Sequence, residues 1–141
     1  MVSTSPNKQR KTAANAALHT KRKRMRARCL DPAFANIRSV TVRIGDEVEI
    51  RRGDAGSPGA SANDSNKREG GARGQGGHKA KVVSIDVKTG KVSLEGLTQS
   101  KADNKEEAYS VHASNVAVTK VDVSDPIRLK ELQNRNGGDE E

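Results

Sequence analysis

Residues 42–54, "VRIGDEVEIRRGD", and residues 77–96, "GHKAKVVSIDVKTGKVSLEG", alternate apolar and polar side chains with a period of two. That period is typical of strands that bury one face. Gly45-Asp46 and the tripeptide at 88–90, Lys-Thr-Gly, interrupt it as short turns. The two segments therefore predict strands joined by tight connections.

The alternation extends beyond both segments. Val40 precedes it, and "YSVHASNVAVTKVDV" at residues 109–123 supplies one or two further strands. Four to six short strands of this kind within about 85 residues favour a small, mainly β barrel over alternating strands and helices. We assign residues 38–123 to this barrel. Residues 124–141 are expected to form a short C-terminal helix, with Asp125 as its N-cap, followed by an acidic tail.

Composition limits the size of the core. Hydrophobic residues make up 32% of the 141 residues, against about 45–50% in ordinary globular domains. Phe34 and Tyr109 are the only aromatic residues. The single cysteine, Cys29, rules out an intrachain disulfide, and the arginines around it are expected to lower the pKa of its thiol. No apolar run approaches the ~20 residues of a membrane span.

Charge is concentrated at the N-terminus. The net charge is +8, but residues 1–30 alone hold nine Lys and Arg and no acidic residue, so the remainder carries −1. Such an arm suits a polyanion, either nucleic acid or an anionic membrane surface. We assign residues 1–37 to it, with a helical piece between Lys11 and Leu18. Asp31-Pro32 predicts a helical turn ending near Asn36.

A long polar segment, residues 55–78, separates two of the expected strands. It is rich in Gly, Ser and Asn, and its largest aliphatic residue is alanine. It cannot bury enough apolar surface to order itself, so we expect it to be mobile in the free protein. Two interpretations stay open: a tolerated surface insertion, or a loop that becomes ordered on a polyanion.

The sequence offers little for catalysis. Its three histidines show no metal-ligand spacing, and no phosphate-binding P-loop is present. Asp46, Glu47 and Glu49 lie on a strand with alternate positions facing solvent, which argues against an acid–base pair. We expect no catalytic residue, metal, cofactor or small-molecule substrate. With so few aromatic rings, RNA would be bound through phosphate, ribose and shape rather than by base stacking.

Three segments together resemble one known family. Residues 42–54 and 77–96 resemble the KOW motif, with Gly53 as its key glycine. "GLTQSKADNKEEAYSVHASNVAV" at 96–118 and "NKQRKTAANAALHTKRKRMRA" at 7–27 are similar to segments of the universal large-subunit ribosomal protein numbered twenty-four, called twenty-six in eukaryotes. The second resembles the basic extension of archaeal and eukaryotic members. Ala80 stands where KOW usually has glycine, and the 55–78 loop is longer than usual.

The resemblance implies an SH3-like barrel in the large subunit of the cytoplasmic ribosome. It further implies binding to the 5′ domain of large-subunit rRNA, a role in early assembly, and neighbouring ribosomal proteins near the exit of the peptide tunnel. No membrane partner is implied. A KOW-containing transcription elongation or regulatory factor is the alternative, although such factors usually carry an additional α/β domain that residues 1–37 are too short to form.

The residues expected to contact RNA are basic or polar, apart from one glycine. They are Lys8, Arg10, Lys11, His19, Lys21, Arg22, Lys23, Arg24, Arg26, Arg28, Arg43, Arg51, Arg52, Gly53, Lys67, Arg68, Arg73, Lys79, Lys81, Lys101, His112, Ser114 and Asn115.

Overall fold

The computed structural model describes residues 3–56 and 75–137. The strands are β1 (Arg26–Cys29), β2 (Ser39–Thr41), β3 (Glu47–Ile50), β4 (Lys79–Asp86), β5 (Lys91–Ser100), β6 (Glu106–His112) and β7 (Val116–Lys120). The α-helices are α1 (Pro6–Ala14), α2 (Leu18–Arg24), α3 (Gly53–Gly56) and α4 (Pro126–Gly137), and the 3-10 turns are η1 (Pro32–Phe34) and η2 (Ala113–Asn115). None of the helices in the described ranges has the length and apolar character needed to cross a membrane.

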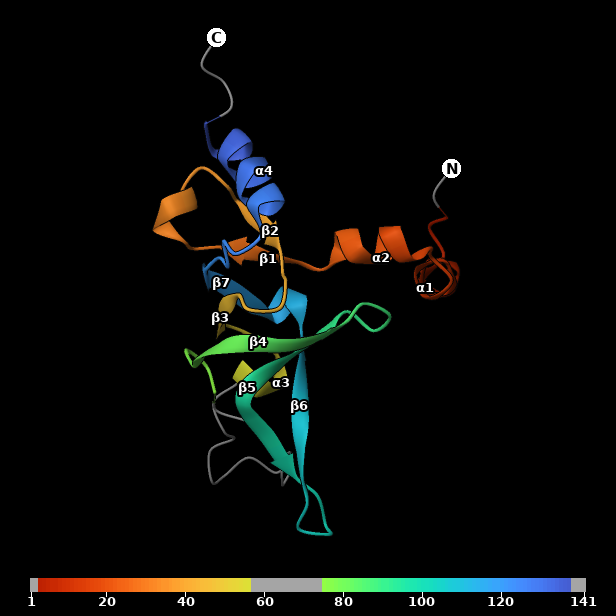
Figure 1. The fold of residues 1–141 in the computed structure, drawn as a ribbon. Coiled ribbons are helices and arrows are strands. Elements are labelled where there is room, and N and C mark those ends of the chain that lie inside the picture. The colour runs from red at the N-terminus through yellow and green to blue at the C-terminus, as the bar shows by residue number, and fades with distance from the viewer. Residues whose placement is uncertain (1–2, 57–74, 138–141) are drawn as a thin grey trace.

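Within residues 3–56 and 75–137, seven strands form one sheet in the order β2-β1-β7-β3-β4-β5-β6. Neighbours are antiparallel except β1 and β7, which run parallel. Figure 1 shows α4 at one end of the molecule, the β5–β6 hairpin reaching toward the other, and α1 and α2 extending to one side. The predicted mainly β architecture with a C-terminal helix is confirmed.

The core lies where β3 and β7 meet at the centre of the sheet. Val48, Ile50, Val92 and Val118 are completely buried, and three of them lie on this central pair of strands. Alternate positions of β3 bury Val48 and Ile50 and leave Glu47 and Glu49 partly exposed, as the period of two predicts. This aliphatic core positions the charged side chains around it.

Residues 25–37 belong to the sheet and core, although the sequence analysis placed them in the arm. Met25, Ala27 and Cys29 are buried, and β1 pairs with β2 through Ala27 and Val40. The exposed positions of β1 are both arginines, so in the sequence this strand looks like the end of the basic arm. The arm is therefore limited to residues 1–24, and neither of its helices, α1 and α2, has a buried residue. The expected helical piece is two helices, α1 and α2, broken at residues 15–17.

Two predicted helix starts are confirmed by their caps. Asp31 accepts a bond of 2.9 Å from the backbone N–H of Ala33 and so caps η1. Asp125 accepts one of 2.9 Å from Ile127 at the start of α4. That bond, and a second from the Arg43 guanidinium, hold the pKa of Asp125 below its usual 3.8. Local sequence thus determined both starts.

Asp46 does not face solvent as expected. It is fully buried and accepts two bonds from the Arg128 guanidinium, at 2.6 and 2.8 Å. Arg128 also donates to the carbonyl oxygens of Thr41 and Asp122. A buried carboxylate needs such a partner, and here it comes from α4. The pair fastens α4 to the turn before β3.

Most of the long loop, with Lys67, Arg68 and Arg73, lies outside the described residues. Its two ends are described: the backbone N–H of Gln75 donates a bond of 2.8 Å to the carbonyl of Ala55, within α3. The chain turns into β4 at Gly77, which has a positive φ of 81°. Ala80, the departure from KOW, lies inside β4 opposite Val48, where no glycine is needed.

Candidate nucleic-acid interface

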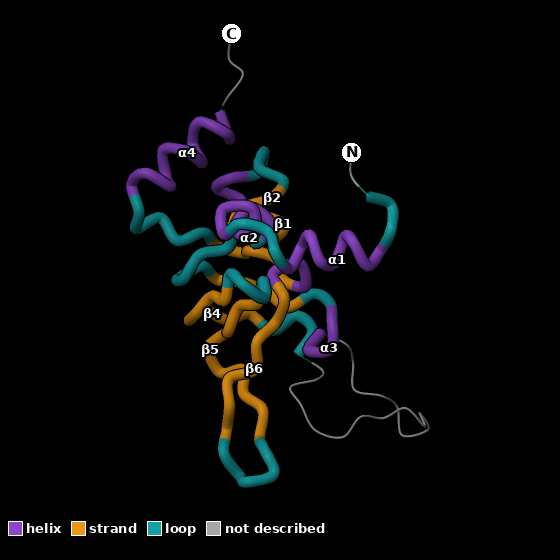
Figure 2. Tube along the Cα trace, turned by 90° about the vertical axis from the view of Figure 1, so that its right-hand side faces the viewer, coloured by secondary structure: helices purple, strands orange, loops and turns teal. Residues whose placement is uncertain are grey.

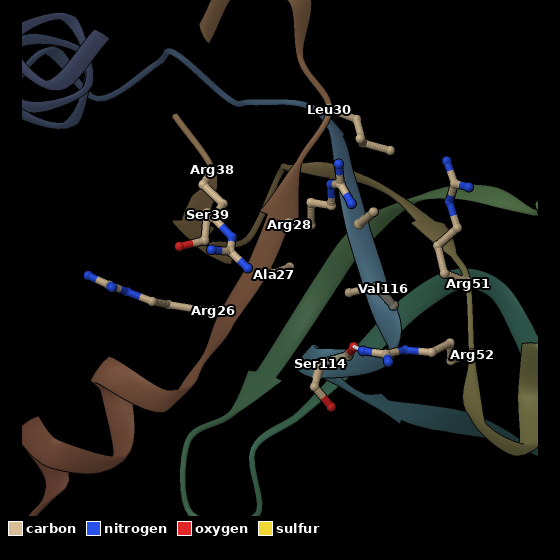
Figure 3. A pocket seen from close by; sticks show the side chains of 11 residues that line it. Arg26, Ala27, Arg28, Leu30, Arg38, Ser39, Arg51, Arg52, Ser114 and Val116 are labelled. Carbon is tan, nitrogen blue, oxygen red and sulfur yellow. Dashed lines mark hydrogen bonds between the residues drawn. The ribbon is translucent and has the colours of Figure 1, made fainter. Parts of the chain in front are cut away.

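Five arginines from three separate segments line one groove of about 750 Å³. Arg26 and Arg28 come from β1, Arg38 is the residue before β2, and Arg51 and Arg52 are the two residues after β3 (Figure 3). The remaining lining residues are Ala27, Leu30, Ser39, Ser114, Val116 and Ala117. We call this the arginine groove. Strand pairing of β1 with β2 and β7 holds its two walls together.

The arginine groove is strongly positive. All five arginines are exposed, and within the described ranges only Arg51 forms an ion pair, at 3.0 Å to Glu49. Arg52 is steadied by a bond of 3.2 Å to the backbone carbonyl of Ser114, drawn in Figure 3. Unneutralised guanidinium groups facing a concave surface suit phosphate, which they can bind with two parallel hydrogen bonds. The apolar strip beneath could contact ribose.

A second basic cluster forms where the arm meets the β4–β5 turn. Lys21 and Arg24 of α2 lie beside Lys88, Gly90 and His112 around a smaller hollow. In Figure 1 the β4–β5 turn points to the same side of the molecule as α1 and α2, and this side faces the viewer in Figure 2. The other basic residues of the arm, and His19, are exposed or partly exposed on α1 and α2. The arm therefore extends the positive surface of the arginine groove.

His112 and Asn115 have roles within the protein. The Nδ1 atom of His112 accepts from the backbone N–H of Ser114 at 3.2 Å and pairs with the Ser114 hydroxyl at 2.8 Å, which caps η2. The side chain of Asn115 packs against Gly53. The backbone carbonyl of Asn115 accepts hydrogen bonds from the backbone N–H groups of Arg51 and Arg52, at 2.9 and 3.1 Å. These contacts support the arginine groove from below, whereas direct RNA contact by either residue stays a prediction.

Four predicted residues lie apart from the arginine groove. Arg43 bonds to Asp125 at 2.6 Å beside α4, and Lys101 pairs with Glu107 at 2.6 Å in the β5–β6 hairpin. Lys79 and Lys81 are exposed on β4, paired in register with Glu49 and Glu47 of β3. An acidic neighbour weakens the attraction of each of these residues for phosphate, so their RNA contacts remain predictions.

Two basic residues that were not expected to contact RNA, Arg38 and Lys88, line these two hollows. Arg38 precedes β2 and lines the arginine groove opposite Arg51 and Arg52, and Lys88 lies in the β4–β5 turn. Neither belongs to a charge run, so only the fold brings them to the positive surface. The signal that could have found Arg38 is its place just before a strand expected to pair in the barrel.

The described part of the structure contains neither a metal site nor an activated cysteine. No group of His, Cys, Asp and Glu there is arranged to hold a metal ion. Burial raises the pKa of the Cys29 thiol above its usual 9.0, contrary to the expected lowering by arginines. The side chains of Arg26 and Arg28 point away from the buried face on which Cys29 lies, so their charge does not offset the loss of solvation.

The family model and the individual relatives that match this chain belong to the same protein family. A sequence model that describes ribosomal proteins L26 of eukaryotes and their L24-type archaeal counterparts matches residues 3–135. The large ribosomal subunit protein uL24 of Saccharolobus solfataricus is 34% identical over 135 residues, covering 94% of this chain and 97% of the relative. Those of Methanocella arvoryzae and Natronomonas pharaonis are 33% and 34% identical, covering 96% and 91% of this chain and 94% and 92% of the relatives.

Proposed function

Because the chain belongs to the family of eukaryotic L26 and archaeal L24-type ribosomal proteins, we propose that it binds large-subunit rRNA through the arginine groove and the helical arm. The family is one of structural components of the large ribosomal subunit, so the chain is a cytoplasmic ribosomal protein and not an enzyme. The match over nearly the whole chain leaves the transcription-factor alternative without support.

The observation that carries the proposal is the arginine groove itself. Four of its arginines lack an ion-pair partner among the described residues, and they come from three segments that the sheet holds in fixed positions. Because the backbone of these segments is already ordered, phosphate binding restricts only the arginine side chains. An RNA backbone in the groove would neutralise this cluster of like charges.

The arm supplies a second, less constrained contact. α1 and α2 present seven Lys and Arg with no acidic residue, and no residue of either helix is buried. Such a segment gains its stability from a partner rather than from packing on its own protein. We assign it the phosphates that lie beyond the arginine groove.

The remaining parts of the proposal rest on the family resemblance. They are binding to the 5′ domain of the rRNA, a role in early subunit assembly and a place among ribosomal proteins near the tunnel exit. The domain division into an arm, a barrel with an SH3-like closure and a C-terminal helix is also proposed, with the arm now limited to residues 1–24.

The test is a salt titration of binding to a transcript of the rRNA 5′ domain. The variant carries Arg28→Gln, Arg38→Gln and Arg51→Gln, and the matched control carries Lys105→Gln, Lys120→Gln and Lys130→Gln, exposed cations away from the groove. Losing three phosphate contacts should flatten the slope of log K against log[salt] by about 2–3. If the two triple variants lose affinity and slope equally, the groove is not the binding site.

A further inference from the structure

A second groove of the molecule is apolar, and RNA binding gives it no role. It has a volume of about 560 Å³ and lies between α2, the turn before β3 and the far end of β4. Buried Met25 and Val42 form its floor, and Ile44, Ile85 and Val87 form its walls. We call it the apolar groove.

Ile44 is unusual within this groove because 60% of its surface is exposed. A single exposed aliphatic side chain is ordinary, but one beside a hollow that reaches the core marks an interaction site. Only 32% of the residues of the chain are hydrophobic. A partner that covered Ile44 would remove this apolar surface from water.

The chemistry of the lining indicates which partner. Two cations, Arg22 and Arg43, line the groove, and no acidic residue does. Arg43 is already paired with Asp125, whereas Arg22 has no ion-pair partner among the described residues. The complementary occupant therefore carries one or two large apolar side chains and a nearby carboxylate.

RNA fits this groove poorly. Apart from Thr41 and the two arginines, its lining is aliphatic, so it offers few hydrogen-bond partners for base edges and no aromatic ring on which a base could stack. We propose that the apolar groove binds a peptide segment of a neighbouring large-subunit protein, with an aliphatic or aromatic side chain seated against Ile44 and an acidic residue facing Arg22. This inference rests on the proposed place of the chain in the ribosome.

The experiment uses assembled large subunits that contain a photoreactive benzoylphenylalanine at position 44. After irradiation, the cross-linked peptide is identified by mass spectrometry. The expected product is a ribosomal-protein peptide with an apolar side chain at the cross-link and Asp or Glu close by. The same photoreactive residue at Ile127, an isoleucine on α4 that is 77% exposed, is the matched control and should not label that peptide. A cross-link to rRNA, a cross-link within the chain itself or no cross-link would overturn the proposal.

A substitution separates this proposal from rRNA binding. Ile44→Asp should weaken the affinity for the identified partner by about tenfold or more, because an apolar anchor is replaced by a charge. Ile127→Asp should not. The two variants should bind rRNA with affinities within about twofold of each other, because each substitution makes the net charge more negative by one unit. Unchanged partner affinity in Ile44→Asp would overturn the inference while leaving the RNA proposal standing.

Discussion

Gly53 is the residue at which the fold and the arginine groove meet. It has a φ of 86°, and a Cβ atom there would collide with the side-chain amide of Asn115. Gly96 has a similar φ of 72° but open space around its Cβ position. Comparing substitutions at these two glycines therefore separates the effect of backbone strain from that of steric collision.

We expect Gly96→Ala to lower the free energy of unfolding by about 1–2 kcal/mol through strain alone. Gly53→Ala should lower it by at least about 1 kcal/mol more, because Asn115 must also move. Urea denaturation of both variants measures the difference. Equal losses would mean that the Asn115 contact yields without cost and that only the positive φ requires glycine at position 53.

Cys29 shows how packing reverses an expectation drawn from neighbouring residues in the sequence. Burial raises the pKa of its thiol, and only 9% of the residue is exposed. At mildly alkaline pH, the native protein should react with iodoacetamide at least about tenfold more slowly than the urea-unfolded chain. Mass spectrometry of timed samples gives both rates. Similar rates in the two states would show that the thiol is accessible and activated.

At the scale of elements, one buried ion pair joins the C-terminal helix to the turn before β3. Arg128 of α4 is 4% exposed and binds Asp46, whereas Arg135 of the same helix is exposed and makes one bond, to the carbonyl of Ser39. Arg128→Met should lower the free energy of unfolding by about 3–5 kcal/mol, because it leaves a buried carboxylate without its partner.

The matched change Arg135→Met should cost no more than about 1 kcal/mol. Thermal or urea unfolding followed by circular dichroism compares the two variants. Comparable, small losses from both would mean that Asp46 is solvated or otherwise compensated, and that α4 is not held through this pair.

The elements themselves differ in how far the sequence predicts them. β3, β4 and β7 follow from the period of two, and η1 and α4 follow from Asp31 and Asp125, because strand alternation and capping are local. β1 was missed because its exposed positions are arginines. The Asp46–Arg128 pair could not be predicted, since it joins residues 82 positions apart that only the fold brings together. The arginine groove is similar: Arg51 and Arg52 were expected, but their meeting with Arg38 depends on sheet order.

At the scale of the whole molecule, the structure separates the arm from the body. Deleting residues 1–24 removes α1 and α2 and leaves β1 in the sheet, whereas a deletion through residue 30 would also remove a strand. If the seven Lys and Arg of residues 1–24 neutralise about 5–7 phosphates, their deletion should flatten the salt slope of rRNA binding by several units.

The same deletion should leave the free energy of unfolding within about 0.5 kcal/mol of the full chain, because no residue of α1 or α2 is buried. Filter binding across a salt series and urea denaturation give the two values. An unchanged salt slope would rule out the arm as a main phosphate contact, and a large loss of stability would show that the arm packs on the body.

We propose different partners for the two grooves of the molecule, RNA for the arginine groove and protein for the apolar groove. The measurement that bears most directly on the first assignment is a cryo-electron microscopy map of the large subunit that contains this chain. The guanidinium groups of Arg28, Arg38, Arg51 and Arg52 should lie within hydrogen-bond distance, about 3 Å, of rRNA phosphate oxygens. An arginine groove that faces solvent or is filled by another protein, with rRNA confined to other surfaces, would contradict the account.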